Sequence, residues 1–156
     1  DIKPANIYIR TDGSPVLLDF GAARQVLATR GKKITPMYTP GFAAPEQYRD
    51  SESDQLGPWT DVYGIGASIF ACFAAFAPQS ADSRMREDHY VSARKLWMGK
   101  YSDDLLSLVD ECLKLDIMAR PQSVLQVQKL LMQKAEPPPK PLISRISERL
   151  ADLVKR

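Results

Sequence analysis

Residues 1–21, DIKPANIYIRTDGSPVLLDFG, hold two short β-type runs on either side of a strong turn signal. The runs are residues 7–9 (IYI) and 16–18 (VLL). The intervening RTDGSP contains Asp-Gly and a proline, which favour a tight turn. The pattern therefore predicts a small β-hairpin at the start of the chain.

Four polar side chains flank this hairpin: Asp1, Lys3 and Asn6 before it, and Asp19 after it. Because a hairpin brings its outer ends together, we expect the two carboxylates and the amide to converge. Such a group suits phosphoryl transfer, since oxygen ligands hold Mg²⁺, a carboxylate accepts the proton of an attacking hydroxyl, and a lysine neutralises phosphoryl charge. No one of these residues is informative alone, and the prediction comes from their spacing.

The composition is that of an ordinary globular domain, with 156 residues, 44% apolar and 26% charged. The net charge of +2 gives no support for a nucleic-acid partner, and we expect none. No run of eighteen apolar residues exists, so the sequence predicts no membrane segment within this chain and a cytoplasmic location. An anchor elsewhere in the parent protein stays open.

Neither cysteine nor histidine suggests a metal site. Cys72 and Cys112 each lie in an apolar stretch and are predicted to be buried as small hydrophobic side chains, with no disulfide. The single histidine, His89, has no partner pattern around it, so a structural or exposed position is favoured over a catalytic one.

The middle of the chain predicts a helical domain. Residues 22–43 read as a long functional loop, and residues 44–50 as one helical turn. Residues 60–77 are apolar on every face, which predicts a helix buried all round, with Thr60 or Asp61 at its N-cap.

The following segments alternate between loop and helix. Residues 78–89 are polar and predicted to be a loop, and residues 90–98 a helix. A further helix starts at Ser102 or Asp103, and another has Pro121 near its first turn.

The C-terminal part divides into two segments. Residues 135–141 (AEPPPKP) predict a semi-rigid linker of polyproline type. Residues 142–156 predict a short amphipathic helix, which either docks on the domain, frays, or begins a longer connector.

Several ordered motifs resemble the eukaryotic-type (Hanks-type) serine/threonine protein kinases. DIKPAN, DFG and APE stand in the order of the family's catalytic loop, magnesium loop and substrate-side segment. TPGFAAPEQY, TDVYGIGA and DIMARPQS extend the resemblance over residues 1–134, which are interpreted as a partial kinase domain. The residues of these motifs, especially FGAARQ and APEQY, are most similar to those of bacterial members of the family. The implied fold is mainly α with a small β-hairpin, the large (C-terminal) lobe of a kinase without its N-lobe.

The resemblance implies catalytic roles for five residues. Asp1 would be the base that orients the substrate hydroxyl, and Lys3 would contact the γ-phosphoryl group. Asn6 and Asp19 would hold Mg²⁺, and Thr39 would bridge Asp1 and Lys3 and favour Ser/Thr substrates.

Other residues gain structural or nucleotide-binding roles from the same resemblance. Glu46 and Arg120 would form a buried ion pair, and Asp61 would hydrogen-bond the catalytic-loop backbone. Phe20 would be the structural aromatic residue of the magnesium loop. Tyr8 takes the place of an aliphatic side chain that usually forms the floor under adenine.

The loop between residues 19 and 46 would be the activation loop. Thr35, or alternatively Thr29, is a candidate for a regulatory phosphate, with Arg24 as its nearest cation; the two threonines are equally well explained as ordinary loop residues. Tyr38 departs from the family, which usually has glycine there.

The resemblance implies an ATP-dependent kinase that uses Mg²⁺, with Mn²⁺ as an alternative ion, and that acts on Ser/Thr of protein substrates. The chain starts at the catalytic aspartate, so we expect its partner to be the missing N-lobe of the same protein and expect this fragment alone to be inactive. The alternatives are a pseudokinase or scaffold that binds partners, and a remnant without function of its own.

Overall fold

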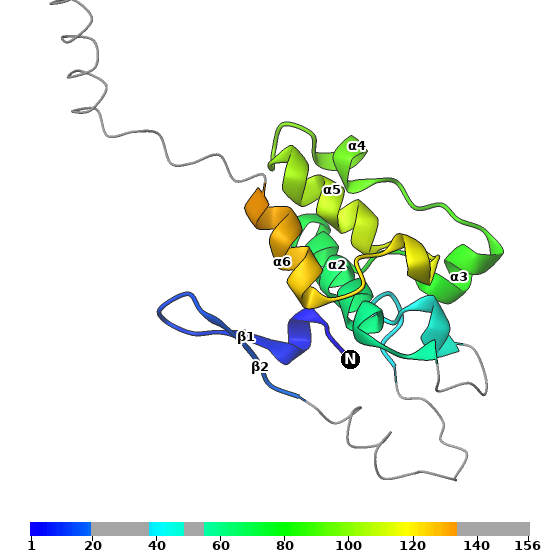
Figure 1. The fold of residues 1–156 in the computed structure, drawn as a ribbon, viewed down its shortest axis with the longest axis horizontal. Helices are drawn as coiled ribbons and strands as arrows, with labels where there is room; N and C mark the ends of the chain where they lie inside the picture. Colours follow the sequence, from blue (N-terminus) through cyan, green and yellow to red (C-terminus); the bar gives the residue numbers. More distant parts are fainter. Residues whose placement is uncertain (20–37, 49–54, 134–156) are drawn as a thin grey trace, which may run out of the picture.

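A computed structural model describes residues 1–19, 38–48 and 55–133 of the chain. Within these ranges the protein is mainly helical, with one two-stranded antiparallel sheet (Figure 1). This is the predicted fold class. The predicted linker 135–141 and helix 142–156 lie outside the described residues.

The N-terminal hairpin follows a short 3₁₀ turn, η1 (Pro4–Asn6). Strand β1 (Ile7–Ile9) pairs with β2 (Pro15–Leu17), one residue earlier than predicted for the second strand, with Tyr8 opposite Val16. Gly13 has a φ of 83°, which suits the tight turn between the strands. The hairpin extends away from the helical body (Figure 1).

Helix α2 (Pro58–Ala74) is the centre of the helical body, and α5 (Asp103–Cys112) and α6 (Val124–Gln133) pack against it. A Cβ atom at Gly66 would lie 2.5 Å from Cys112 Cβ, so glycine is what allows α2 and α5 to approach this closely. Val62, Leu108 and Val127 join Cys112 in a buried cluster that ties the three helices together.

The start of α2 differs from the prediction. Its N-cap is Gly57, with Pro58 in the first turn, where a missing N–H has no cost. Thr60 lies inside the helix, and its hydroxyl accepts a hydrogen bond from the Gly57 amide (3.2 Å). Thr60 is therefore free to donate to a partner outside the helix.

The prediction that α2 and both cysteines are buried was wrong in part. Cys112 is buried, which raises the pKa of its thiol to about 12, but Cys72 is exposed. Ile65 and Ile69, which precede Cys72 on the same face at helical spacing, are only partly buried. Composition shows that a helix is apolar on all sides, but it does not show how many of those sides a neighbour covers.

The helices after α2 are short. Residues 78–89 were predicted to be a loop, but α3 (Ala81–Arg86) forms there, with the Ser80 side chain accepting from the Ser83 amide at its N-cap. Helix α4 (Ala93–Trp97) falls within the predicted range, and α5 begins after Ser102 as predicted. His89 is exposed, as expected, and lies 3.3 Å from Glu87.

A buried arginine that sequence reasoning missed holds this region. Arg84 is 5% exposed, and its Nη1 donates to the carbonyl of Leu113 at 2.7 Å. Its Nε donates to Asp88 at 2.9 Å, and that hydrogen bond lowers the pKa of the Asp88 carboxyl. The guanidinium also lies 4.5 Å from the ring centre of Tyr90.

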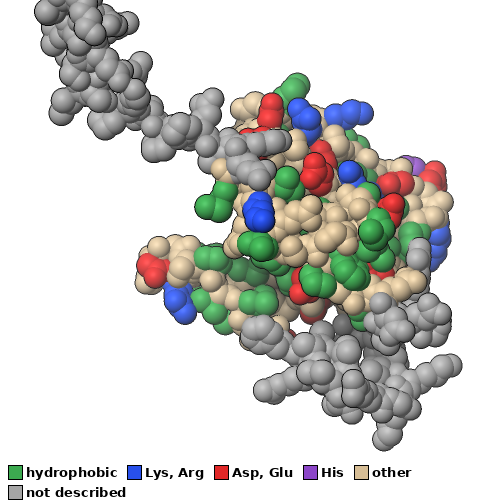
Figure 2. Space-filling model, viewed as in Figure 1, with side chains coloured by type: hydrophobic (Ala, Val, Ile, Leu, Met, Phe, Trp, Pro, Cys, Tyr) green, Lys and Arg blue, Asp and Glu red, His purple; other side chains and the backbone are tan. Residues whose placement is uncertain are grey.

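The surface view shows apolar side chains on the hairpin and over the helical body (Figure 2). On the hairpin these are Tyr8, Ile9 and Leu18, each more than half exposed. No helix in the described part of the chain has the length and apolar character needed to cross a membrane.

The exposed apolar hairpin generates a first prediction. Tyr8 and Ile9 are neighbours on one strand and so point to opposite faces, which leaves both faces of the hairpin apolar. We expect residues 1–156 to bind a hydrophobic fluorescent dye strongly, and Tyr8→Ser combined with Ile9→Thr and Leu18→Thr to remove most of the emission. Leu125→Thr on α6 is the control, and equal emission from both variants would contradict the prediction.

Candidate active site

Asp1, Lys3 and Thr39 form a closed triangle of hydrogen bonds. Lys3 Nζ lies 2.6 Å from Asp1 Oδ2 and 2.6 Å from Thr39 Oγ1. The Thr39 hydroxyl donates to Asp1 Oδ1 at 3.0 Å. The three side chains, 38 residues apart in sequence at most, thus meet at one point.

Asn6 is joined to the same point. Its Nδ2 donates to the Asp1 carbonyl at 2.8 Å and approaches Asp1 Oδ2 at 3.4 Å. Because the amide nitrogen faces Asp1, the amide oxygen points elsewhere and can act as a ligand. The Asn6 carbonyl accepts the Leu18 amide at 2.9 Å, which brings Asp19, the next residue, to the end of the strand pair beside Asn6.

Asn6 and Asp19 have the donor chemistry that Mg²⁺ requires. An amide oxygen and a carboxylate are hard oxygen ligands, and Mg²⁺ is usually bound by one or two carboxylates with phosphates and water completing the octahedron. The described residues contain no cluster of three or more His, Cys, Asp or Glu that could hold a metal. The amide oxygen of Asn6 and the carboxylate of Asp19 are donors that fit an Mg²⁺ ion shared with a phosphate group.

The segment that carries Asp1 and Ile2 lies directly on α2. A Cβ atom at Gly64 would be 3.0 Å from Ile2 Cβ and 3.1 Å from the Ile2 carbonyl oxygen. A larger residue at Gly64 would push the loop away. Asp1 is held in place because its neighbour is packed against a buried position of the central helix.

The substrate-side loop, residues 38–48, is held by its own turn. The Thr39 carbonyl accepts the amides of Phe42 (3.1 Å) and Ala43 (3.2 Å). Gly41 has a φ of 89°, and a Cβ there would lie 2.9 Å from Ala77 Cβ, so both conformation and space require glycine. These constraints fix the backbone at Thr39.

A buried ion pair anchors the other end of this loop. Glu46, in η2 (Pro45–Tyr48), accepts two bonds from Arg120, at 3.1 and 2.7 Å, and both side chains are fully buried. Thr60 donates to Glu46 at 2.9 Å, and Arg120 donates to the carbonyl of Trp59 at 3.0 Å. Sequence reasoning gave the pair through the family resemblance and missed Thr60 and Trp59, although Thr60 was already a candidate capping residue.

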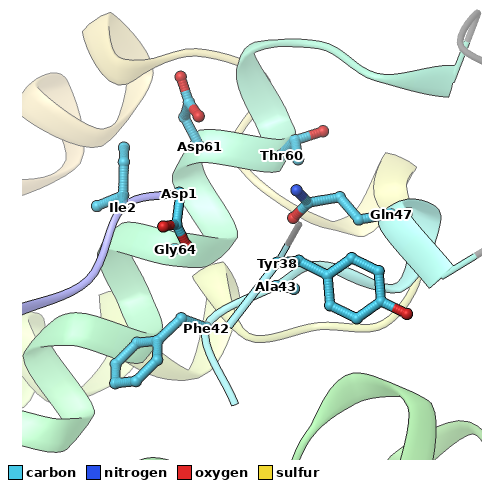
Figure 3. Close-up of a pocket in the computed structure, with 9 residues that line it drawn as sticks. All are labelled: Asp1, Ile2, Tyr38, Phe42, Ala43, Gln47, Thr60, Asp61 and Gly64. Atoms are coloured by element: carbon cyan, nitrogen blue, oxygen red, sulfur yellow. The ribbon is translucent and has the colours of Figure 1, made fainter. Parts of the chain in front are cut away.

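A small hollow is lined by Asp1 and eight other residues, which Figure 3 shows as sticks. Asp61 lies at its rim, exposed, and within the described residues it makes no hydrogen bond to the catalytic-loop backbone. Tyr38 lines the hollow, and its ring centre lies 4.4 Å from that of Tyr48. Burial raises the pKa of the Tyr48 hydroxyl to about 12, and in the described part of the protein this hydroxyl has no hydrogen-bond partner.

The remaining predicted residues are separate from this cluster or are not described. Tyr8 is on β1, 53% exposed. Phe20, Thr29 and Thr35, with Arg24, lie outside the described residues.

Comparison with known proteins identifies the family. The family model of the protein kinase domain matches residues 1–134. The chain is 29% identical to serine/threonine-protein kinase pakB of Dictyostelium discoideum, over 79% of this chain and 15% of pakB. It is 36% identical to serine/threonine-protein kinase PknL of Mycobacterium tuberculosis, over 54% of this chain and 21% of PknL. The solved structure "PpkA-294 apo form" superposes with a TM-score of 0.68 at 36% identity, over 84% of this chain and 45% of that one.

The chain belongs to the protein kinase family, and the curated relatives named above are serine/threonine-protein kinases. It spans less than half the length of each of these relatives.

The ion pair of Glu46 and Arg120 generates a stability prediction. Arg120→Met would leave a carboxylate buried without its cation, and we expect the free energy of unfolding to fall by about 3–5 kcal/mol. Urea denaturation of residues 1–156 measures the change. The control is Arg86→Met, which removes an exposed pair with Asp82 and should leave the free energy of unfolding almost unchanged. Equal losses in the two variants would show that burial of the pair is unimportant.

Proposed function

We propose that this chain forms the catalytic-loop and substrate-loop part of an enzyme that transfers the γ-phosphoryl group of ATP to Ser or Thr hydroxyls of proteins. The observation that carries the proposal is the hydroxyl of Thr39, bonded to both Asp1 and Lys3. This contact joins the candidate base, the candidate phosphate-binding cation and the substrate loop in one geometry.

Each residue of the cluster has a defined task in this proposal. Asp1 orients the substrate hydroxyl and accepts its proton, while Lys3 neutralises charge on the transferred group. Asn6 and Asp19 hold Mg²⁺, which supplies charge neutralisation at the phosphates when bound. Tyr8 packs against the adenine ring from its strand, in the place where the family usually has an aliphatic residue.

The second candidate function is that of a pseudokinase or scaffold, which would bind partners without turnover. The presence of Asp1, Asn6 and Asp19 together argues against it, because a binding surface has no need of a base and two metal ligands. The hydrogen bonds that join Asp1 to Lys3, Asn6 and Thr39 also favour the enzyme, because a binding surface has no need to hold these four side chains together.

We predict that residues 1–156 alone transfer no phosphate, because the family's glycine-rich loop and strand lysine are not among them. The full-length protein should phosphorylate a Ser/Thr protein substrate in the presence of Mg²⁺ and lose this activity in EDTA. Transfer of ³²P from labelled ATP measures both. In the full-length protein, Asp1→Asn should lower kcat by roughly 10²–10⁴-fold.

The outcomes of this experiment separate the two candidates. Turnover by purified residues 1–156 would contradict the claim that this part is inactive. A full-length protein that binds ATP but shows equal, background transfer with and without Asp1→Asn would be a scaffold.

The Thr39 bridge generates a further prediction. In the full-length protein, Thr39→Ala removes hydrogen bonds to two charged groups, and we expect kcat to fall by about ten- to a hundredfold. Thr39→Ser keeps the hydroxyl and should retain most of the activity. Steady-state kinetics with one peptide substrate checks this, and equal activity of the two variants would rule out a role for the hydroxyl.

A further inference from the structure

Tyr38 stands where the family usually has glycine, immediately before Thr39. A glycine there would carry no side chain to hold the loop. The question is what the aromatic side chain adds to the site.

The ring of Tyr38 packs on Tyr48, at the far end of the same loop. The two ring centres lie 4.4 Å apart, with the planes tilted by 55°. Tyr48 itself packs against the main buried cluster, which includes Ala44 and Tyr63. The contact therefore joins the two ends of the loop of residues 38–48, and Tyr48 attaches this loop to the core.

The next residue along the chain is the one that must be placed accurately. Thr39 reaches Asp1 and Lys3 only while its backbone stays where the turn to Phe42 and Ala43 holds it. From these contacts we propose that Tyr38 is a positioning residue, which holds Thr39 between Asp1 and Lys3 through its ring contact with Tyr48. The inference rests on the proposed function and adds a residue that acts on the site through Thr39.

The alternative is that Tyr38 contacts the substrate directly, since it also lines the hollow beside Asp1 (Figure 3). The two explanations predict different kinetics. A residue that acts through Thr39 changes kcat, because the misplaced group is needed in the transition state. A residue that only contacts the substrate changes KM.

The first test is independent of activity and uses residues 1–156. The amides of Phe42 and Ala43 donate to the Thr39 carbonyl, so their hydrogen exchange reports on the turn. We expect Tyr38→Ala to accelerate exchange at both amides by roughly tenfold or more, and Tyr38→Phe to leave it unchanged, because the contact is made by the ring. The control is Tyr101→Ala, which removes a stacked ring contact between the α4–α5 connection and Phe73 of α2. Unchanged exchange in Tyr38→Ala would overturn the proposal.

The second test uses kinetics of the full-length protein. Tyr38→Ala should lower kcat roughly tenfold at nearly constant KM, and Tyr38→Phe should restore it. In a Thr39→Ala background the same change should have almost no further effect, because the group that Tyr38 positions is already gone. A rise in KM alone, or effects that multiply in the double variant, would overturn the proposal.

The two tests also separate this proposal from the proposed function. If the unchanged full-length protein transfers no phosphate, the kinase function fails. The exchange experiment then still decides whether Tyr38 holds the loop at Thr39.

Discussion

The fully buried ion pair of Glu46 and Arg120 is the contact on which the arrangement of the site depends. It joins η2 to a segment 74 residues later, and through Thr60 and Trp59 it also fixes the start of α2. Such a pair is expensive to bury and adds little net stability, but a partner left alone is costly, so only one arrangement of the three segments is tolerated. The pair therefore determines geometry more than it determines stability.

From this anchor the two halves of the site are placed on one helix. The loop of residues 38–48 is attached to the start of α2 through Glu46, and the segment that carries Asp1 lies on α2 at Gly64, about one turn further along. Because both loops share one rigid support, Thr39 and Asp1 meet although they are far apart in sequence. Helix α2 thus brings Thr39 to Asp1, and the hairpin brings the segments that carry Asn6 and Asp19 together.

Local patterns predicted the parts of this structure that depend on neighbouring residues. The Asp-Gly turn predicted the hairpin from adjacent residues. The contact of Thr39 with Asp1 and the pair of Glu46 with Arg120 join distant segments, and they were expected only from the resemblance to the family. Helix α3 was missed because its sequence, ADSRMR, has too few apolar residues to show a period; it is held by Arg84, whose partners are distant in sequence. The exposure of Cys72 also depends on what covers α2, which no local pattern contains.

The hydrogen bonds around Asp1 limit what else can bind to it. An ionised carboxylate has about four lone-pair sites. Lys3 at 2.6 Å, Thr39 at 3.0 Å and Asn6 at 3.4 Å take up three of them. One direction is left, which the proposed function assigns to the substrate hydroxyl, and the carboxylate cannot rotate without breaking its bonds to Lys3 and Thr39. These bonds hold the carboxylate in one orientation, and a fixed orientation is what the proposed function requires of a base.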